Sequence, residues 1–134
     1  MDALEPIGVI GIGYVGLVTA ACFADLGHPV ICRDIDPERV AVLERGEVPL
    51  HEPGLTELVQ RNRERLTFTL DLDALFARAS IAFVCVDTPP TVSGDADLSR
   101  VHAVMEAIPP AAAGCILVMK STVPVGTGER LRVA

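Results

Sequence analysis

Three glycines with the spacing GxGxxG stand near the start of the chain and constrain its fold more than any other feature. The β-branched run at residues 7–10 leads directly into Gly11, Gly13 and Gly16, and a stretch of helical character at 17–26 follows. In that context Gly11 permits a tight turn, Gly13 lets a pyrophosphate approach the backbone, and Gly16 lets the helix pack closely on the strand. The pattern predicts a strand, turn and helix that bind a dinucleotide.

The rest of the chain continues the alternation of strands and helices. Further strands are expected at residues 29–34, 66–69, 81–86 and 115–120, and further helices at 37–45 (with Asp36 as N-cap), 55–63, 71–79, 98–108 and from about 126. Short connections between alternating strands and helices predict a parallel sheet with helices on both faces. We therefore expect one α/β domain over residues 1–134, a Rossmann-type doubly wound sheet with the strand order 3-2-1-4-5.

Asp34, at the end of the second expected strand, bears on which dinucleotide binds. A carboxylate there can accept hydrogen bonds from both ribose hydroxyls and repels a 2′-phosphate, which favours NAD over NADP. Arg39 either lies near the adenosine ribose or is an ordinary solvated helix residue. Arg33 is expected on the opposite face of the sheet by strand alternation, which makes it a poor candidate for holding a 2′-phosphate. The alternative is that Asp34 only caps a turn and the glycines only permit packing.

Charge and hydropathy exclude two classes of partner. The net charge of -7 argues against nucleic-acid binding, because neutralising phosphates requires clustered Lys and Arg. The one basic run, at residues 61–65, is interpreted as a solvated helix end. Residues 7–24 carry no charge and are long enough to be considered as a membrane span. The acidic preceding segment, the interrupting glycines and the lack of flanking Lys or Arg argue against it, so no membrane partner is expected.

The cysteines indicate a compartment rather than a site. Cys22, Cys32, Cys85 and Cys115 fall within or at the edge of apolar stretches, with no CxxC pair and no His at ligand spacing. We interpret them as reduced, buried thiols of a cytoplasmic protein, with no metal site.

Four strings resemble one known family when taken together. They are "GYVGLVTA", "GEVPLHEPGL", "FVCVDTPP" with "ADLS" shortly after, and "KSTVPVGT". In this order and at these spacings the chain, from residue 7 to its end, resembles the N-terminal NAD-binding domain of the UDP-glucose 6-dehydrogenase family. Related enzymes acting on UDP-N-acetylmannosamine or GDP-mannose share the layout, but "EPGL" and "KSTVPVGT" resemble the UDP-glucose branch more.

The resemblance implies an NAD-dependent oxidoreductase that oxidises UDP-glucose to UDP-glucuronate with two NAD, through an aldehyde held by an active-site cysteine. It implies that the pyrophosphate is held by Gly11, Gly13, Tyr14, Val15 and Gly16, the adenosine ribose by Asp34 and Arg39, and the far side of the cofactor by Thr88 and Thr122. It also implies a catalytic role for Thr122, which helps to hold the water used in catalysis. A hydroxyl suits that role because it both donates and accepts a hydrogen bond. The alternative for Thr122 is a cap of the helix after Pro124.

Two positions depart from the family pattern. Asp87 stands where the family more often has Gly or Asn, and its carboxylate would either repel the pyrophosphate or point to solvent. His51 stands where Tyr is common and is interpreted as a surface substitution. The family's nucleophilic cysteine is expected beyond this chain, because Cys32 and Cys85 sit in predicted strands, where burial makes a thiol inert.

We therefore expect a truncated NAD-binding domain that binds NAD without turning over UDP-glucose by itself. The full-length protein is expected to be a homodimer that takes its UDP-sugar mostly through other regions. Alternatives are the same domain of a UDP-N-acetylmannosamine or GDP-mannose dehydrogenase, a stand-alone nucleotide-binding module, or another Rossmann chemistry such as a 3-hydroxyacid dehydrogenase or a methyltransferase.

Overall fold

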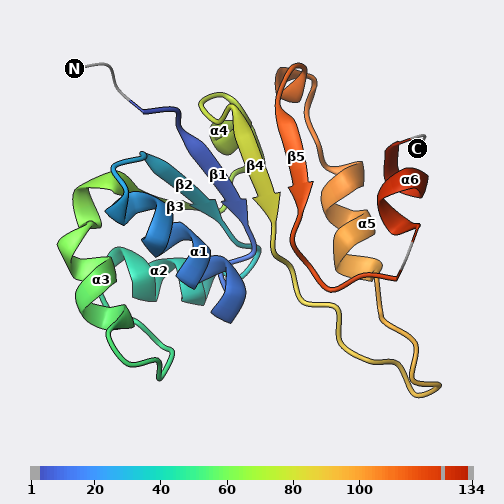
Figure 1. The fold of residues 1–134 in the computed structure, drawn as a ribbon, viewed down its shortest axis with the longest axis horizontal. Coiled ribbons are helices and arrows are strands. Elements are labelled where there is room, and N and C mark those ends of the chain that lie inside the picture. Colours follow the sequence, from blue (N-terminus) through green and yellow to red (C-terminus); the bar gives the residue numbers. More distant parts are fainter. Residues whose placement is uncertain (1–3, 125, 133–134) are drawn as a thin grey trace.

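Parallel strands form the centre of the computed structural model, which describes residues 4–124 and 126–132 (Figure 1). The strands are β1 (Ile7–Ile10), β2 (Val30–Arg33), β3 (Leu66–Thr69), β4 (Ile81–Val84) and β5 (Ile116–Met119). They form one sheet in the order β3-β2-β1-β4-β5, and every neighbouring pair is parallel. The predicted doubly wound topology is confirmed.

Helices cover both faces of this sheet, as predicted (Figure 1). On one face lie α1 (Tyr14–Asp25), α2 (Pro37–Glu44) and α3 (Leu55–Arg61), and on the other α4 (Leu72–Phe76) and α5 (Ser99–Glu106). The chain also forms α6 (Thr127–Arg132) and the short 3₁₀ turns η1 (Arg63–Arg65) and η2 (Pro110–Ala112). Asp36 caps α2 as expected, since its Oδ1 accepts a hydrogen bond from the Glu38 backbone N–H at 3.0 Å.

Strand alternation divides the core into two apolar layers. In β1, Val9 packs in the layer under α1, and Ile10 in the layer under α4 and α5. Both side chains are fully buried, as expected for the central strand of a parallel sheet. The edge strand β5 differs, because Ile116 is 60% exposed. Burial therefore falls from the centre of the sheet toward β5.

Most elements are shorter than expected at one or both ends, and for α1 and β4 the hydrogen bonds show why the boundary differs. Helix α1 begins at Tyr14 rather than at residue 17, because the Leu17 N–H already donates to the Gly13 carbonyl oxygen at 2.9 Å. Strand β4 ends at Val84 rather than at residue 86. The Val84 carbonyl accepts hydrogen bonds from the backbone N–H groups of both Lys120 (2.9 Å) and Ser121 (3.0 Å), which closes the ladder with β5 at that point.

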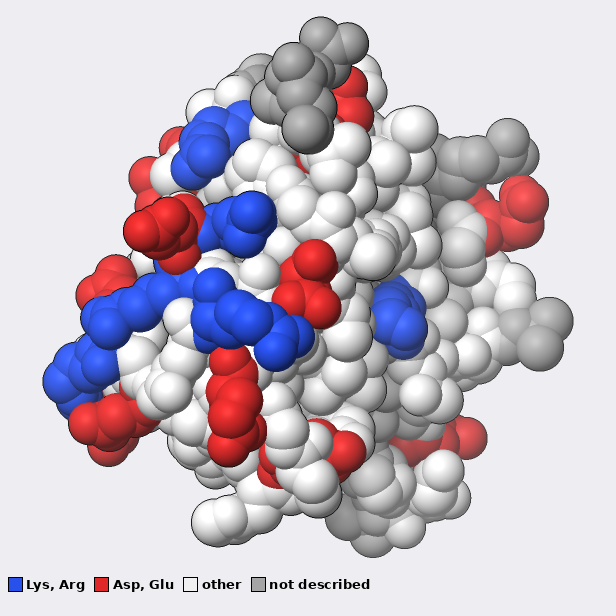
Figure 2. Space-filling view, turned by 60° about the vertical axis from the view of Figure 1, so that its left-hand side comes forward, with Lys and Arg blue, Asp and Glu red and all other residues white. Residues whose placement is uncertain are grey.

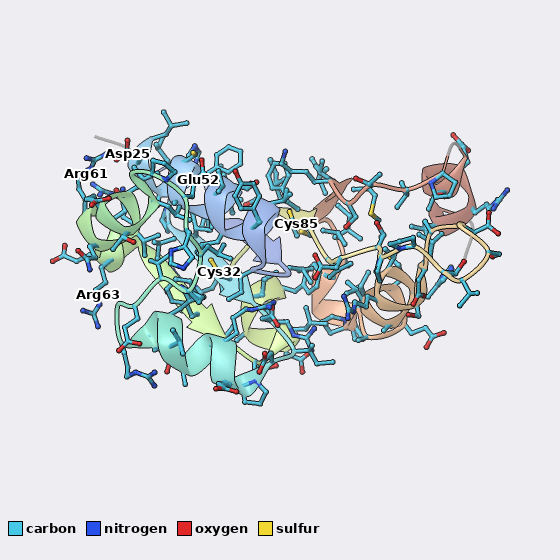
Figure 3. All side chains as sticks on the ribbon, turned by 90° about the horizontal axis from the view of Figure 1, so that it is seen from below. Asp25, Cys32, Glu52, Arg61, Arg63 and Cys85 are labelled. Atoms are coloured by element: carbon cyan, nitrogen blue, oxygen red, sulfur yellow. The ribbon has the colours of Figure 1, made fainter. Side chains whose placement is uncertain are left out.

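The outer surface carries mixed charge. Figure 2 shows Lys and Arg side chains interleaved with acidic ones on the face that it displays. Within the basic run, Arg61 ends α3 and forms an ion pair with Asp25 at 3.0 Å at the periphery (Figure 3). The interpretation of this run as an exposed helix end is confirmed. None of the helices within residues 4–124 and 126–132 is long and apolar enough to cross a membrane.

The expectation that all four cysteines are buried is wrong for Cys22, which is exposed on α1. The reason is helical periodicity, since Ala20, Ala21 and Ala24 turn toward the core and position 22 faces outward. Cys115 is half-buried, whereas Cys32 and Cys85 are buried. All four are free thiols.

Candidate dinucleotide site

The turn between β1 and α1 has a geometry that requires glycine at two positions. Gly11 has a φ of +93°, and a Cβ on it would lie 2.9 Å from the Val86 backbone nitrogen. A Cβ on Gly16 would overlap the Gly11 carbonyl oxygen and lie 3.3 Å from the Cys85 Cβ. Both contacts are closer than a side chain allows, so α1 packs directly on the turn and on the chain after β4.

Gly13 lies on the open side of the same turn. A Cβ there would have only the Asp87 Oδ1 within contact range, at 3.7 Å. Gly13 is the N-cap of α1, and within the described residues no side chain caps the helix and its first turn holds no acidic residue. A helix N-terminus presents free N–H donors and partial positive charge. The turn therefore offers an anion both room and donors.

Asp34 ties this turn to the loop before α2. Its carboxylate is 5% exposed, and its Oδ2 accepts hydrogen bonds from the Ile12 N–H at 2.9 Å and the Arg39 guanidinium at 3.3 Å. Its Oδ1 accepts from the Asp36 N–H at 3.0 Å. The expectation that Asp34 caps a turn is thus met, and the same carboxylate also lies on the wall of a cavity.

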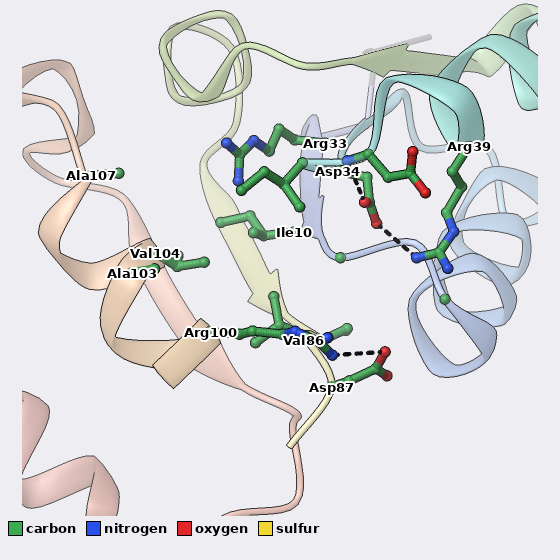
Figure 4. Close-up of a pocket in the computed structure, with 15 residues that line it drawn as sticks. Ile10, Arg33, Asp34, Arg39, Val86, Asp87, Arg100, Ala103, Val104 and Ala107 are labelled. Carbon is green, nitrogen blue, oxygen red and sulfur yellow. Dashed lines mark hydrogen bonds and ion pairs between the residues drawn. The ribbon is translucent and has the colours of Figure 1, made fainter. Parts of the chain in front are cut away.

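That cavity, of about 360 Å³, opens at the carboxyl ends of β1, β2 and β4, where doubly wound sheets bind their ligands. Four segments line it (Figure 4): the β1 end and turn (Ile10, Gly11, Gly13), the β2 end (Arg33, Asp34, Ile35, Asp36, Arg39), the β4 end (Cys85, Val86, Asp87), and α5 (Arg100, Ala103, Val104, Ala107). Of the predicted site residues, the lining brings together Gly11, Gly13, Asp34 and Arg39, and it leaves out Tyr14, Val15, Gly16, Thr88 and Thr122.

The cavity reaches further around the strand ends than the sequence suggested, and Arg33 lines it. Alternation does place Arg33 on the same side of the sheet as its β1 partner Ile10, as expected. The cavity extends over that side, so the Arg33 side chain lines it next to Asp34 (Figure 4). Its Nε also donates to the Leu70 carbonyl oxygen at 3.2 Å, which holds the side chain against the loop after β3.

Sequence reasoning also missed the wall that α5 contributes. Ala103, Val104 and Ala107 present a small apolar surface to the cavity, and flat apolar walls of this kind suit a ring system. Their spacing on one face of a helix was visible in the sequence. The sequence did not show on which side of the sheet this face of α5 would lie.

Asp87 lies beside the glycine turn and forms an ion pair across the cavity. Its Oδ2 accepts a hydrogen bond from Arg100 of α5 at 3.4 Å (Figure 4). The two side chains are 66% and 57% exposed, respectively. The expectation that the Asp87 carboxylate points to solvent is therefore confirmed, whereas its repulsion of a pyrophosphate stays a prediction.

The ends of β4 and β5 are joined by hydroxyl groups. Thr88 Oγ1 donates to the Thr122 carbonyl oxygen at 2.6 Å. Ser121 Oγ donates to the Val86 carbonyl at 2.7 Å and lies 3.2 Å from the Val84 carbonyl oxygen. The two predicted threonines thus lie together beyond the cavity, on its β4–β5 side. The catalytic role of Thr122 stays a prediction.

Tyr14 contacts a second segment of the chain rather than the cavity. Its hydroxyl donates to Glu52 Oε2 at 2.9 Å, and this hydrogen bond, with the charge of Glu52, raises the pKa of Tyr14. The side chains of Tyr14 and Val15 are 53% and 45% exposed. The groups through which they can reach a phosphate are therefore their backbone N–H groups, in the first turn of α1. His51, next to Glu52, is exposed, in agreement with its interpretation as a surface residue.

The buried thiols of Cys32 and Cys85 are unreactive near neutral pH. Burial raises the pKa of Cys85 to about 11 and raises the pKa of Cys32 well above its ordinary range. Cys32 lies in β2, as expected, while Cys85 follows β4 and lies under the glycine turn (Figure 3). Since the thiolate is the reactive form, neither is a nucleophile near neutral pH, as predicted.

The donor set suits a nucleotide. Within residues 4–124 and 126–132, no three His, Cys, Asp or Glu side chains come together as a metal ion would require. The cavity instead combines an open glycine turn at a helix N-terminus, a buried carboxylate and an apolar helical wall. These features fit the diphosphate, ribose and base of a dinucleotide.

Comparison with known proteins agrees with this geometry. The model of the NAD-binding domain of the UDP-glucose/GDP-mannose dehydrogenase family matches residues 5–134. The chain is 53% identical over 126 residues to the UDP-glucose 6-dehydrogenase of Pseudomonas aeruginosa, an alignment that covers 92% of this chain and 28% of that protein. The chain therefore spans less than a third of this relative's length.

Solved structures of two such enzymes superpose closely. The UDP-glucose dehydrogenase of Pyrobaculum islandicum gives a TM-score of 0.87 at 37% identity, covering 97% of this chain and 32% of that one. The GDP-mannose dehydrogenase of Pseudomonas aeruginosa gives 0.84 at 32% identity, covering 93% and 30%. Both likenesses extend over nearly all of this chain.

Proposed function

This chain belongs to the UDP-glucose/GDP-mannose dehydrogenase family, whose NAD-binding domain it matches, and we propose that it forms the NAD site of a UDP-glucose 6-dehydrogenase. The observation that carries the proposal is the cavity bounded by the open Gly13 turn, the Asp34 carboxylate and α5. The choice of UDP-glucose is supported by the higher identity to the UDP-glucose enzyme than to the GDP-mannose enzyme of the same organism.

The residues of the cavity divide among the parts of NAD. We assign the diphosphate to the backbone N–H groups at the start of α1, beside Gly11 and Gly13. The remaining lone pairs of Asp34 accept the ribose hydroxyls, with Arg39 holding that carboxylate in place. The adenine ring lies against the α5 wall. The nicotinamide half then extends toward Thr88 and Thr122 at the ends of β4 and β5.

The reaction requires this site to work twice. Converting a CH₂OH group to a carboxylate removes two hydrides and consumes one water, and NAD accepts one hydride in each step. In this proposal the chain itself holds the cofactor's adenosine half, and the Thr122 hydroxyl orients the water, because a hydroxyl can both donate and accept a hydrogen bond. The buried thiols Cys32 and Cys85 take no part, because their raised pKa values keep them protonated.

Calorimetric titration with NAD tests the proposal directly. We expect the 134-residue chain to bind NAD and to bind NADP at least about tenfold more weakly, since Asp34 repels a 2′-phosphate. Gly13→Ala should lose at least about tenfold in NAD affinity with its melting temperature unchanged, because the added methyl group enters the diphosphate space and meets the protein only in an ordinary contact, 3.7 Å from Asp87 Oδ1.

Gly128→Ala is the matched control, since a Cβ there meets nothing within 4 Å. It should bind NAD as the wild type does. No heat of binding for NAD with the folded wild-type chain would refute the proposal. Binding without turnover by these residues alone remains our prediction, and it is checked by following NADH absorbance with UDP-glucose present.

A second candidate is the same domain of a GDP-mannose or UDP-N-acetylmannosamine dehydrogenase. It is favoured by the close superposition of the GDP-mannose enzyme. A panel of nucleotide sugars offered to the full-length protein separates the two, with UDP-glucose expected to be the one oxidised. Homodimerisation and contact with the UDP-sugar through other regions belong to this proposal too. So does the cytoplasm as compartment, which the free thiols favour.

A further inference from the structure

The charged groups around the cavity are unevenly engaged. Three arginines line it, together with three aspartates. Arg39 donates to the buried Asp34, and Arg33 donates to a backbone carbonyl oxygen. Arg100 differs from both, because it and its partner Asp87 are both more than half exposed. Of these three arginines, Arg100 can most easily exchange its present partner for another anion.

The Arg100 guanidinium also lies at the glycine end of the cavity. Asp87 Oδ1 is 3.7 Å from the position that a Cβ on Gly13 would occupy, and Asp87 Oδ2 is 3.4 Å from Arg100 Nη1. Asp87 therefore lies between the turn and the guanidinium, and Figure 4 shows its ion pair with Arg100. The apolar positions of α5, Ala103 and Ala107, lie one and two turns further along the helix. The guanidinium is thus placed by the diphosphate end rather than by the base end.

We propose that Arg100 is a diphosphate-binding residue, and that Asp87 competes with the cofactor's phosphates for it. This inference rests on the proposed NAD site and adds a residue pair to it. A planar guanidinium with several donors suits a phosphate better than it suits one exposed carboxylate. Without cofactor, the Asp87 carboxylate pairs with the Arg100 guanidinium. When the cofactor binds, this ion pair breaks and the guanidinium pairs with a phosphate instead.

Competition predicts a specific pattern of affinities. Removing Arg100 removes an attraction, whereas removing the charge of Asp87 releases Arg100 for the phosphate. The gain from Asp87→Asn should therefore depend on the presence of Arg100. If Asp87 merely repelled the phosphates at a distance, its effect would be the same with or without Arg100, which is what a double-mutant cycle distinguishes.

The experiment is a calorimetric cycle with NAD, ADP and adenosine on the wild type, Arg100→Ala, Asp87→Asn and the double variant. We expect Arg100→Ala to weaken NAD and ADP about tenfold and adenosine less than about twofold. Asp87→Asn should tighten NAD about threefold in the wild-type background and less than about 1.5-fold in the Arg100→Ala background.

Arg45→Ala is the matched control. Arg45 forms a similar exposed ion pair, with Glu47 at 3.5 Å and exposures of 58% and 64%, outside the cavity lining. It should leave all three affinities unchanged, and all variants should melt within a few degrees of the wild type.

Three results would overturn the inference: unchanged NAD affinity in Arg100→Ala, equal weakening of adenosine and ADP, or an Asp87→Asn gain that is equal in both backgrounds. Each of these leaves the proposed NAD site standing, provided that the wild type binds NAD. A wild-type chain that binds neither NAD nor ADP would refute the proposed function and this inference together.

Discussion

The cavity lies at the carboxyl ends of the strands, and the two sides of this edge of the sheet are built differently. The ends of β1 and β2 form one side, and the ends of β4 and β5 form the other. On the β1–β2 side, Asp34 is 5% exposed and accepts hydrogen bonds from two backbone N–H groups and Arg39. On the β4–β5 side, Asp87 is 66% exposed, Thr122 is exposed, and Thr88 reaches it through a hydrogen bond to its carbonyl oxygen.

The two sides should therefore respond differently to substitution, one mainly in the stability of the fold and the other mainly in ligand affinity. On the β1–β2 side the residues that we propose to bind the cofactor also hold the turn and loops together, so substitutions there should destabilise the domain. On the β4–β5 side the residues are surface groups on an edge whose strand is itself partly exposed. Substitutions there should change binding while leaving the free energy of unfolding nearly intact.

The largest expected effect is that of Gly16→Ala. The added Cβ overlaps the Gly11 carbonyl oxygen, a backbone atom that cannot move without disturbing the turn. The free energy of unfolding should fall by at least about 3 kcal/mol, measured by urea denaturation. Gly128→Ala, where a Cβ meets nothing within 4 Å, should not destabilise the chain. A Gly16→Ala chain within about 1 kcal/mol of the wild type would show that the turn is not packed as described.

The next effect contrasts the two acids directly. Asp34→Ala leaves the buried N–H of Ile12 and the Asp36 N–H without their acceptor, and should cost about 2–3 kcal/mol. Asp87→Ala removes only an exposed ion pair, and should change stability by less than about 0.5 kcal/mol. Equal losses in the two variants, by the same urea measurement, would remove the distinction between the sides.

Alkaline pH should destabilise the domain through the buried thiol of Cys85. Burial raises the pKa of this thiol from 9.0 to about 11, so the unfolded chain loses its proton at lower pH than the folded chain. The stabilisation is present below pH 9 and is lost as pH rises toward 11, by about 2 kcal/mol. Unfolding free energies measured across this range should fall less steeply for Cys85→Ala, and an identical slope in both chains would count against the burial of the thiol.

The smallest expected effects lie on the β4–β5 side. Ser121→Ala removes the hydroxyl that bonds the Val86 carbonyl and should cost about 1 kcal/mol. Thr88→Val removes an exposed hydrogen bond to Thr122 and should cost about 0.5 kcal/mol. In thermal melts, the melting temperature should fall more for Ser121→Ala than for Thr88→Val. A loss of several kcal/mol from Thr88→Val would mean that this side is as firmly built as the other.

The sequence predicted the β1–β2 side well, because its determinants are local. The glycine spacing requires a turn there, and a carboxylate at the end of the next strand necessarily lies beside it. Strand order followed from alternation and handedness. The exposure of Cys22 was missed because an apolar helix without a strong polar face does not reveal its orientation.

The β4–β5 side was harder to predict, because its contacts join segments far apart in the chain. Arg100 meets Asp87 only through the packing of α5 on the sheet. On the β1–β2 side, Arg33 was missed for a similar reason, because it reaches the cavity only where the cavity extends around the strand ends. The periodicity of a sequence shows neither which segment a long side chain reaches in the fold nor the shape of a cavity. Motifs placed Thr88 and Thr122 on the correct loops, but their mutual hydrogen bond is a tertiary feature.

The most direct test of the whole account is an amide-resolved NMR titration of the ¹⁵N-labelled chain, first with ADP and then with NAD. We predict that the signals of Gly13, Val15 and Asp34 shift with both ligands, and that those of Thr88 and Thr122 shift with NAD alone. Unmoved Gly13 and Asp34 signals at saturating NAD, with shifts confined to other parts of the chain, would contradict the placement of the cofactor at this edge.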